Sequence, residues 1–254
     1  MIQIIISPAK MMDFDGDKND IKPTQPLFAG KTKQLVNVCR KLSIKEIAEI
    51  MKINPSMARD VHEYYQTFQF DTTPKRAAAL AYNGIAYKGL NAHDFSKEDF
   101  LFAQKSLSII SGLYGVVRPM DEIKPYRLEM QRKIVPEGYK TLYEFWDETL
   151  TRYFVEKLSG KSPIVVNVAS KEYGKALAMK KMPSNARMVE MNFLQQKGDE
   201  LKQIVVHTKK ARGMLARFII KNRITDIEDV KAFDTEGYFF NSSLSKPNVW
   251  FFVR

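Results

Sequence analysis

The sequence predicts a single α/β domain over residues 1–254, in which helices surround a mixed sheet; an α+β arrangement is also compatible with it. Short β-branched runs, such as 164–168, alternate with longer segments whose apolar residues recur at helical spacing. With 254 residues and 44% apolar content, the chain is long enough to bury a sizeable core. Because it has no repeat, low-complexity tract or obvious linker, we expect one domain. We also expect a monomer.

Strands are predicted where short runs of β-branched and aromatic residues occur. They cover residues 1–6, 164–168, 187–193, 201–206, 233–239 and 249–253. The first of them ends at Ser7 and Pro8, a cap residue followed by a residue suited to the first helical position. We therefore expect a helix to follow this strand.

Helices are predicted from apolar residues at helical spacing and from capping residues. They cover residues 31–42, 43–51, 54–68, 72–82, 96–110, 141–158 and 225–230, and a further helix begins at Ser170. Ser43 and Glu46 have the spacing of a capping box. Asn83-Gly84 is typical of a turn, and residues 13–26 lack periodicity and predict a long loop.

The stretch Gln203–Arg223 is the most informative in the chain. Ile204-Val205-Val206 predicts a buried strand, and Thr208 would cap the helix after it. One helical face then carries the apolar residues Ala211, Met214, Leu215, Phe218 and Ile219, and the opposite face carries Lys210, Gly213, Arg217 and Lys221.

This basic face has two interpretations. A solvated surface is the first. We favour the second, a phosphate-binding face, because cations in the first turn of a helix oppose the macrodipole unless an anion also binds there. A glycine on such a face would let a sugar-phosphate backbone come close.

Charge is unevenly distributed along the chain. Lys and Arg number 40 against 29 Asp and Glu, a net charge of +11 that suggests a polyanionic partner. Residues 161–254 alone carry 17 basic and 9 acidic side chains. The single cysteine, Cys39, excludes an internal disulfide and a cysteine-rich metal site. No signal-peptide pattern or membrane-spanning apolar run is present, so we expect a cytoplasmic protein with no membrane partner.

Three predicted strands end in a similar way, with a hydroxyl residue and then lysine. The pairs are Ser7 with Lys10, Ser170 with Lys171, and Thr208 with Lys209 and Lys210. If the strands are parallel neighbours, these lysines converge on one anion site, with Glu172 as the carboxylate beside it. The alternative is that Ser and Thr are simply common at strand-to-helix turns.

Known catalytic and metal motifs are incomplete. Ser7-x-x-Lys10 lacks the companion motifs of acyl-transfer enzymes, and Gly112-x-x-Gly115 lacks the Lys-Ser/Thr of a P-loop. The three histidines share no metal-ligand spacing, and the acidic loop Asp13-Asp15-Asp17-Asp20 is typical of a solvated turn. We therefore expect no metal and no cofactor, and we assign no catalytic residue.

Several motifs, in this order and spacing, resemble one known family. They are Ile6-Ser7-Pro8-Ala9-Lys10, the stretch 111–119, Lys124-Pro125-Tyr126-Arg127-Leu128-Glu129-Met130, Lys209-Lys210-Ala211-Arg212-Gly213 with Arg217-Phe218-Ile219, and Glu236-Gly237-Tyr238-Phe239. The chain resembles the bacterial YaaA peroxide-stress proteins over nearly its whole length. The resemblance implies a cytoplasmic protein that limits hydrogen peroxide damage from loosely bound iron. It also implies an α/β fold particular to the family, a basic cleft, a helix-hairpin-helix-like element and DNA binding, without an established catalytic activity.

Our candidate for the helix-hairpin-helix element is the predicted helix that ends near Ile110, together with Gly112-Leu113-Tyr114-Gly115. Its glycines are one residue further apart than in the usual pattern, and Pro119 and Pro125 would break the second helix. A helix C-cap followed by a tight turn is the alternative.

Together these features predict a non-enzymatic DNA-binding protein of the peroxide stress response, selective for DNA structure rather than sequence, on double or single strands. The residues expected to contact phosphates are Lys10, Arg118, Arg127, Lys171, Lys209, Lys210 and Arg212, and those expected to let the backbone approach are Gly112, Gly115 and Gly213. One alternative is an enzyme acting on a nucleotide or nucleic acid with Glu129 or Glu172 as acid or base. Another is an iron-handling protein.

Overall fold

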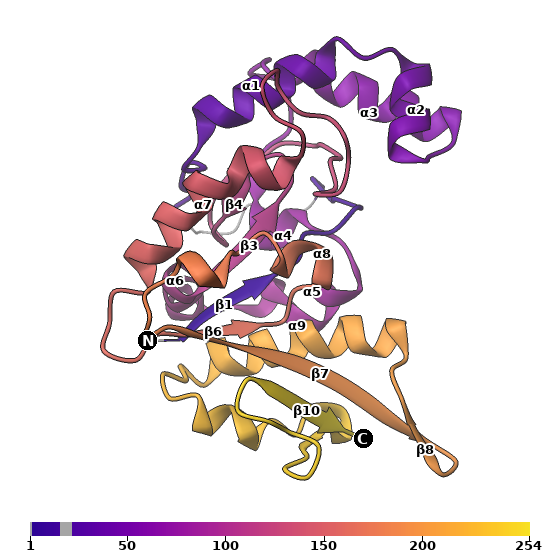
Figure 1. Ribbon diagram of the computed structural model, residues 1–254. Helices are drawn as coiled ribbons and strands as arrows, with labels where there is room; N and C mark the ends of the chain where they lie inside the picture. Colours follow the sequence, from indigo (N-terminus) through magenta and orange to yellow (C-terminus); the bar gives the residue numbers. More distant parts are fainter. Residues whose placement is uncertain (1, 16–21) are drawn as a thin grey trace.

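A mixed sheet forms the centre of the computed structural model, which describes residues 2–15 and 22–254 (Figure 1). Its strands lie in the order β4-β3-β1-β6-β7-β10-β9, and β8 pairs with β7 outside this path. The bounds are β1 (Ile2–Ile6), β3 (Leu107–Ser111), β4 (Gly115–Val117), β6 (Ile164–Asn167), β7 (Arg187–Lys197), β8 (Glu200–Lys202), β9 (Phe239–Phe240) and β10 (Val249–Val253). A separate two-stranded sheet pairs β2 (Arg76–Ala77) with β5 (Glu122–Ile123).

Parallel pairing joins β3, β1, β6, β7 and β10, whereas β4, β8 and β9 are antiparallel to their partners. All five residues of β1 are buried, as expected for a parallel strand covered on both faces. In the register, Ile4 lies between Leu107 of β3 and Val166 of β6. The predicted mixed sheet in a single α/β domain is confirmed.

Helices surround this sheet, and α1 to α3 lie at one end of the molecule, opposite the C-terminal elements (Figure 1). The bounds are α1 (Ala29–Arg40), α2 (Ile44–Met51), α3 (Pro55–Thr67), α4 (Ala78–Ala81), α5 (Ile85–Leu90), α6 (Lys97–Ser106), α7 (Leu142–Lys157), α8 (Lys171–Gly174) and α9 (Val205–Lys221). Short 3-10 turns are η1 (Ala92–Asp94), η2 (Met179–Lys181), η3 (Glu228–Ala232) and η4 (Thr235–Gly237). In the described part of the chain, no helix combines the length and apolarity needed to cross a membrane.

Capping residues mark several helix starts as expected from the sequence. Ser43 forms a capping box with Glu46 at α2, and Ser96 forms one with Asp99 at α6. The side chains of Asn54 and Thr141 accept backbone hydrogen bonds at the starts of α3 and α7.

Several element predictions were wrong in type or extent, and one helix was not predicted. The helix expected to reach residue 110 ends at Ser106, because residues 107–111 pair with β1 as strand β3. The helix over 72–82 is replaced by β2 and the short α4, and the described residues 7–15 after β1 form no helix. The turn at 83–84 leads into α5, which was not predicted. The strand over 233–239 is reduced to β9, because Glu236 and Gly237 have positive φ angles of 55° and 76°.

The start of α9 also differs from the prediction. Ile204 is the cap residue, and Val205 and Val206 lie in the first turn with 64% and 55% of their surface exposed, so this run is not a buried strand. Thr208 is therefore inside the helix, where its buried hydroxyl donates to the carbonyl oxygen of Phe193 at 3.3 Å. The predicted apolar stripe of α9 is confirmed, since its residues pack into the core.

Gly213 does not belong to an exposed basic face. It is buried where α9 meets α5, and an added Cβ would lie 2.7 Å from the backbone nitrogen of Leu90 and closer still to the carbonyl oxygen of Ala86. A Cβ at Gly89 would likewise lie against the backbone of α9, 3.0 Å from Met214 N. These glycines let the two helices touch backbone to backbone, so Gly213 is unavailable to DNA.

The glycine pair at 112 and 115 connects β3 to β4, so the candidate helix-hairpin-helix element is a β-hairpin at this position. Gly112 packs against the backbone of Leu128, and its carbonyl oxygen accepts a hydrogen bond from Trp146 Nε1 at 2.9 Å. Gly115 has a φ of +72°, and an added Cβ would lie 2.6 Å from the Trp146 ring. Both glycines are buried, so neither presents its backbone to a ligand.

Candidate functional site

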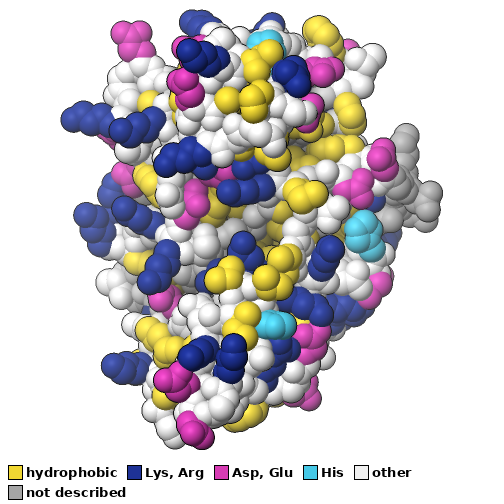
Figure 2. All heavy atoms as spheres, turned by 90° about the vertical axis from the view of Figure 1, so that its right-hand side faces the viewer, with side chains coloured by type: hydrophobic (Ala, Val, Ile, Leu, Met, Phe, Trp, Pro, Cys, Tyr) yellow, Lys and Arg dark blue, Asp and Glu magenta, His cyan; other side chains and the backbone are white. Residues whose placement is uncertain are grey.

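A pocket of about 450 Å³ lies where β1 and β6 end at the same edge of the sheet. It is lined by residues from five segments of the chain, within 6–11, 83–87, 126–129, 168–173 and 209–212. Figure 2 looks onto this side of the molecule and shows a hollowed face with Lys and Arg side chains around it, interspersed with acidic ones. The carboxyl ends of parallel strands are where open α/β sheets bind ligands, so this pocket is the candidate site.

Two serines connect the chain segments that leave the sheet here. The backbone N–H of Ser170, after β6, donates to Ser7 Oγ at 2.8 Å, and the Ser7 hydroxyl lies 3.3 Å from Ser170 Oγ. The hydroxyl of Tyr87 in α5 donates to the Ser7 carbonyl oxygen at 3.0 Å. These bonds fix the floor of the pocket and bring the first two of the three similar strand ends together.

Glu129 lies beside this floor and is buried among three cations. Its carboxylate forms ion pairs with Lys10 at 3.3 Å, Arg127 at 3.2 Å and Arg132 at 3.1 Å. Burial alone would raise the pKa of Glu129, but the hydrogen bond from Arg132 and the surrounding positive charges hold it below its usual value. Glu129 is therefore an ionised anchor that orients Lys10 and Arg127 around the pocket.

Glu172 is a second carboxylate in the same pocket, and its surroundings shift its pKa in the opposite direction to that of Glu129. Burial raises the pKa of Glu172, and the negative charge of Glu129 raises it further, although a hydrogen bond from the Gln131 backbone N–H at 3.2 Å opposes this. Its pKa is therefore above the usual value. Two carboxylates with oppositely shifted pKa values thus face one pocket.

Arg212 and Lys209 approach the pocket from the first turns of α9. The Nε of Arg212 is buried and has no hydrogen-bond partner among the described residues, and the same is true of Arg127 Nε. Burial lowers the pKa of Arg212, while the charge of Glu190 raises it. Arg212 forms no ion pair within the described part of the chain, so a ligand anion is a suitable counter-ion for it.

Comparison with known proteins gives the family. The family model described as peroxide stress protein YaaA matches residues 2–244 of the chain. This chain belongs to the YaaA peroxide-stress family.

Relatives align over nearly the whole chain. A UPF0246 protein of Clostridium perfringens is 38% identical over 255 residues, which cover 98% of each chain. A UPF0246 protein of Maricaulis maris is 40% identical over 256 residues, covering 99% of this chain and 95% of the relative.

The structure brings together four of the seven cations predicted to contact phosphate. Lys10, Arg127, Lys209 and Arg212 all line the pocket. The predicted convergence of Lys10, Lys171 and Lys209 is wrong for Lys171, which does not line the pocket. Lys10 and Lys209 do line it, although Lys209 and Arg212 reach the pocket from within a helix rather than from the end of a strand.

The other three cations lie elsewhere. Arg118 is engaged by the fully buried Asp121, with 2.7 Å between Nη2 and Oδ1. Lys210 forms an ion pair with Glu236. Lys171 is exposed at the start of α8 and does not line the pocket.

Sequence reasoning missed Arg132 and Tyr87. The three-residue spacing of Glu129 and Arg132 could have indicated their ion pair. Tyr87 could not be recognised, because residues 83–84 predicted a turn rather than the start of α5. Within the described residues, no three His, Cys, Asp or Glu side chains gather in a way that could hold a metal ion. Asp17 and Asp20 of the acidic loop lie outside those residues.

Proposed function

We propose that this protein binds DNA phosphates in the pocket at the ends of β1 and β6, as a non-enzymatic cytoplasmic monomer of the peroxide stress response. The observation that carries the proposal is the group of four cations on the pocket, of which Arg212 forms no ion pair within the described chain. The pocket lining also contains two carboxylates, Glu129 and Glu172, beside the four cations Lys10, Arg127, Lys209 and Arg212. Four positive charges minus two negative ones leave a net +2 with both carboxylates ionised, and +3 when Glu172 is protonated.

The form of the pocket favours selection by DNA structure. A volume of about 450 Å³ is in the range of small-ligand sites, so one nucleotide fits where a duplex does not. An unpaired nucleotide or a strand end would enter, while the flanking phosphates contact Lys10 and Lys209 at the exposed rim. Contacts of this kind position the backbone and carry little sequence information. Occupying exposed DNA in this way would limit the iron-dependent oxidative damage that the family resemblance connects with peroxide.

Two adjacent lysines provide the test. Lys209 lines the pocket, whereas Lys210 is held outside it by Glu236. DNA binding is titrated across a series of salt concentrations for the wild type, Lys209→Ala and Lys210→Ala. We expect Lys209→Ala to weaken binding and to reduce the salt slope by roughly 0.9 on duplex or 0.7 on single strands, the value for one phosphate contact.

Lys210→Ala should bind like the wild type, because its charge is already neutralised. Binding that is insensitive to salt, or an equal loss in both variants, would show that DNA phosphates do not occupy this pocket. A junction or overhang that binds no better than blunt duplex would refute the selection by structure.

A second candidate function is an enzyme that acts on a nucleotide or nucleic acid, and the opposite pKa shifts of Glu129 and Glu172 favour it. Glu172, with a raised pKa, is suited to exchanging a proton with a bound substrate, while Glu129 stays ionised. Glu172→Gln distinguishes the two functions. A binding protein should hold DNA at least as tightly after this change, since a negative charge is lost. An enzyme should retain binding and lose turnover of a nucleotide or oligonucleotide substrate.

A further inference from the structure

The hydrogen-bond donors in the pocket at the ends of β1 and β6 indicate which part of a DNA strand would enter it. Arg212 is half-buried there, and its Nε is buried without a hydrogen-bond partner among the described residues. Its two Nη nitrogens also form no hydrogen bond or ion pair with a described residue, but unlike Nε they are not buried. A guanidinium in this state presents a fork of N–H groups that can bind an oxyanion through two of its oxygens.

A second donor comes from the serine pair on the floor of the pocket. Ser7 and Ser170 both line it, and their hydroxyl groups share a single hydrogen bond of 3.3 Å. The other bond to Ser7 Oγ comes from the backbone N–H of Ser170 and uses neither hydroxyl proton. Within the described residues these hydroxyls form no further bond, so one of their two protons is left to donate to a ligand.

Phosphate suits this set of groups better than a nucleobase does. Arg212, the remaining serine proton and the ammonium groups of Lys10 and Lys209 are all donors. Phosphate oxygens only accept hydrogen bonds, whereas the edge of a base has donors as well as acceptors. The carboxylate acceptors of the pocket are already engaged, Glu129 by its ion pairs and Glu172 by a backbone N–H.

The charge of the pocket matches a phosphate at the end of a strand better than one inside it. With both carboxylates ionised, the lining has a net charge of +2. An internal phosphodiester brings a single negative charge, whereas a terminal phosphomonoester brings about −1.5 to −2 at pH 7. The monoester also offers one more free oxygen to the donors than the diester does.

The depth of the pocket favours an end as well. Arg212 is half-buried, whereas Lys10 and Lys209 are exposed at the rim. A phosphate inside a continuous strand would bring the sugars on both sides of it into about 450 Å³, whereas a strand end brings one. The next phosphates along the strand would then lie at the rim lysines, which position the backbone.

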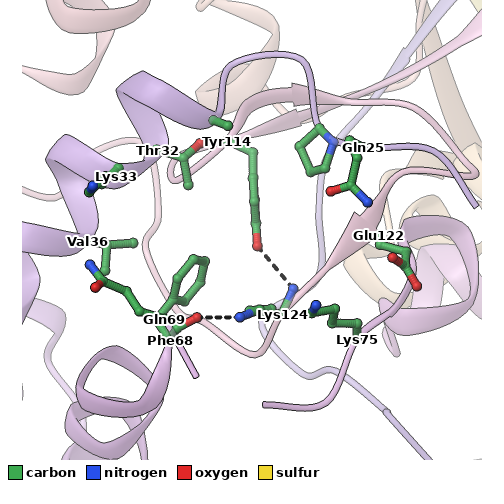
Figure 3. A pocket seen from close by; sticks show the side chains of 12 residues that line it. Gln25, Thr32, Lys33, Val36, Phe68, Gln69, Lys75, Tyr114, Glu122 and Lys124 are labelled. Atoms are coloured by element: carbon green, nitrogen blue, oxygen red, sulfur yellow. Dashed lines mark hydrogen bonds between the residues drawn. The ribbon is translucent and has the colours of Figure 1, made fainter. Parts of the chain in front are cut away.

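Another pocket, of about 410 Å³ beside α1, does not offer these groups (Figure 3). No arginine occurs among the described residues that line it. The Lys124 ammonium there donates to the carbonyl oxygens of Phe68 at 2.6 Å and Phe70 at 3.0 Å. Apolar and aromatic groups of Val36, Phe68 and Tyr114 form much of the wall. This pocket is therefore poorly suited to a phosphate end.

We propose that the pocket at the ends of β1 and β6 binds the terminal phosphomonoester of a DNA strand, with Arg212 and the free serine proton as its donors. The proposal rests on the DNA binding proposed above and specifies which part of the DNA is recognised. Oxidation of a deoxyribose can break the strand and leave phosphomonoester ends, so such a site distinguishes broken DNA from intact DNA. A 5′-phosphate and a 3′-phosphate both offer this chemistry, and the test separates them.

The test measures binding to the full chain by fluorescence anisotropy, with one internally labelled single-stranded oligonucleotide prepared with different ends. The strands have a 5′-phosphate, a 3′-phosphate, hydroxyls at both ends, or the phosphate end capped as its methyl ester. We expect a phosphate-ended strand to bind about tenfold more tightly than the hydroxyl-ended strand, since charge-assisted hydrogen bonds to one oxyanion are gained. The methyl cap removes one charge and one free oxygen, so the capped strand should lose most of this gain.

Three variants locate the phosphate end. Arg212→Gln should bring the affinity ratio of phosphate-ended to hydroxyl-ended strands close to one. Arg217→Gln is the matched control, because Arg217 lies further along the same helix, forms an ion pair with Asp94 and does not line the pocket, so this variant should keep the ratio. Lys209→Ala should weaken both strands alike and also keep the ratio.

Equal affinity for phosphate-ended and hydroxyl-ended strands would overturn the inference, and so would a preference that survives in Arg212→Gln. Either result leaves the DNA-binding proposal standing if Lys209→Ala still weakens every strand, whereas a wild type that binds no strand refutes both. If circular dichroism shows that Arg212→Gln is unfolded, the capped strand decides on the wild type. A capped end that binds as tightly as the free phosphate end would show that the inference is wrong.

Discussion

Replacing Gly213 by alanine should destabilise the protein by about 2 kcal/mol, although the same change in an open helix is stabilising. The new Cβ would lie 2.7 Å from Leu90 N, where an ordinary contact is 3.4–4 Å, and closer still to the Ala86 carbonyl oxygen. Both neighbours are backbone atoms, so α5 must move away from α9. Overpacking of this kind costs up to about 3 kcal/mol. The higher intrinsic helix propensity of alanine offsets up to about 1 kcal/mol of this cost.

The assay is urea unfolding with a thermal melt beside it. A loss of about 2 kcal/mol corresponds to a fall in Tm of roughly 4–8 °C for a domain of this size. Gly30→Ala in α1 is the matched control, since its Cβ would meet open space, and it should be neutral or slightly stabilising. Because α5 and α9 both line the pocket at the ends of β1 and β6, Gly213→Ala should also weaken the DNA binding that we propose for it. A Gly213→Ala variant as stable as Gly30→Ala would refute the close contact between the helices.

Four further predictions concern buried polar groups. Glu129→Gln should lower stability at neutral pH by about 2 kcal/mol. Because the pKa of Glu129 is lower in the folded protein than in the unfolded chain, its stabilising contribution is present above the unfolded pKa of ~4.3. That contribution disappears as the pH falls through the folded pKa. Glu172→Gln should instead stabilise the unliganded protein at neutral pH by up to about 1 kcal/mol, because the raised pKa of Glu172 means that its ionisation above that pKa costs folding energy. Asp121→Asn should cost about 3 kcal/mol by leaving the Arg118 guanidinium without its buried partner. Cys39 is buried and its pKa is raised to about 12, so it should react with Ellman's reagent, and with hydrogen peroxide, only after unfolding.

Controls for these predictions come from the same chain. In urea unfolding near neutral pH, Glu129→Gln should lower the free energy of unfolding and Glu172→Gln should raise it. Changes of the same sign in the two variants would contradict the opposite pKa shifts of the two carboxylates. Glu148→Gln removes an ion pair whose two side chains are 80% and 84% exposed, so it should change stability by less than about 0.5 kcal/mol. Rapid labelling of Cys39 in the folded protein would show that the region around it opens easily.

Helix starts were predictable because they depend on local chemistry. Ser43 and Asn54 satisfy backbone N–H groups within three residues of themselves, and the sequence contains everything needed to see this. Short β-branched runs were ambiguous, because tertiary partners decide their structure. Residues 107–110 were predicted as helix and became part of a strand beside β1, whereas Val205 and Val206 were predicted as strand and became the exposed start of a helix.

The candidate site was predictable in its chemistry and only partly in its geometry. Lysines and arginines near strand ends indicated an anion site, and Lys10 and Arg212 do line one pocket. Sequence could not show that Lys210 is neutralised by Glu236, which lies 26 residues further along the chain. Nor could it show that Gly213 contacts α5, because a contact between backbones leaves no sign in either segment alone.

The position of β1 in the middle of the sheet has a consequence for protein synthesis. Ile2 pairs with Ile164, so the strand leaves the ribosome about 160 residues before its second neighbour exists. At roughly 5–20 residues per second, that delay is about 8–32 s. During this time the apolar segment Ile4–Ile6 has no complete sheet to join, so its unpaired backbone groups and apolar side chains stay exposed on the nascent chain. Completion of the pocket at the ends of β1 and β6 must wait longer still, until α9 has been made.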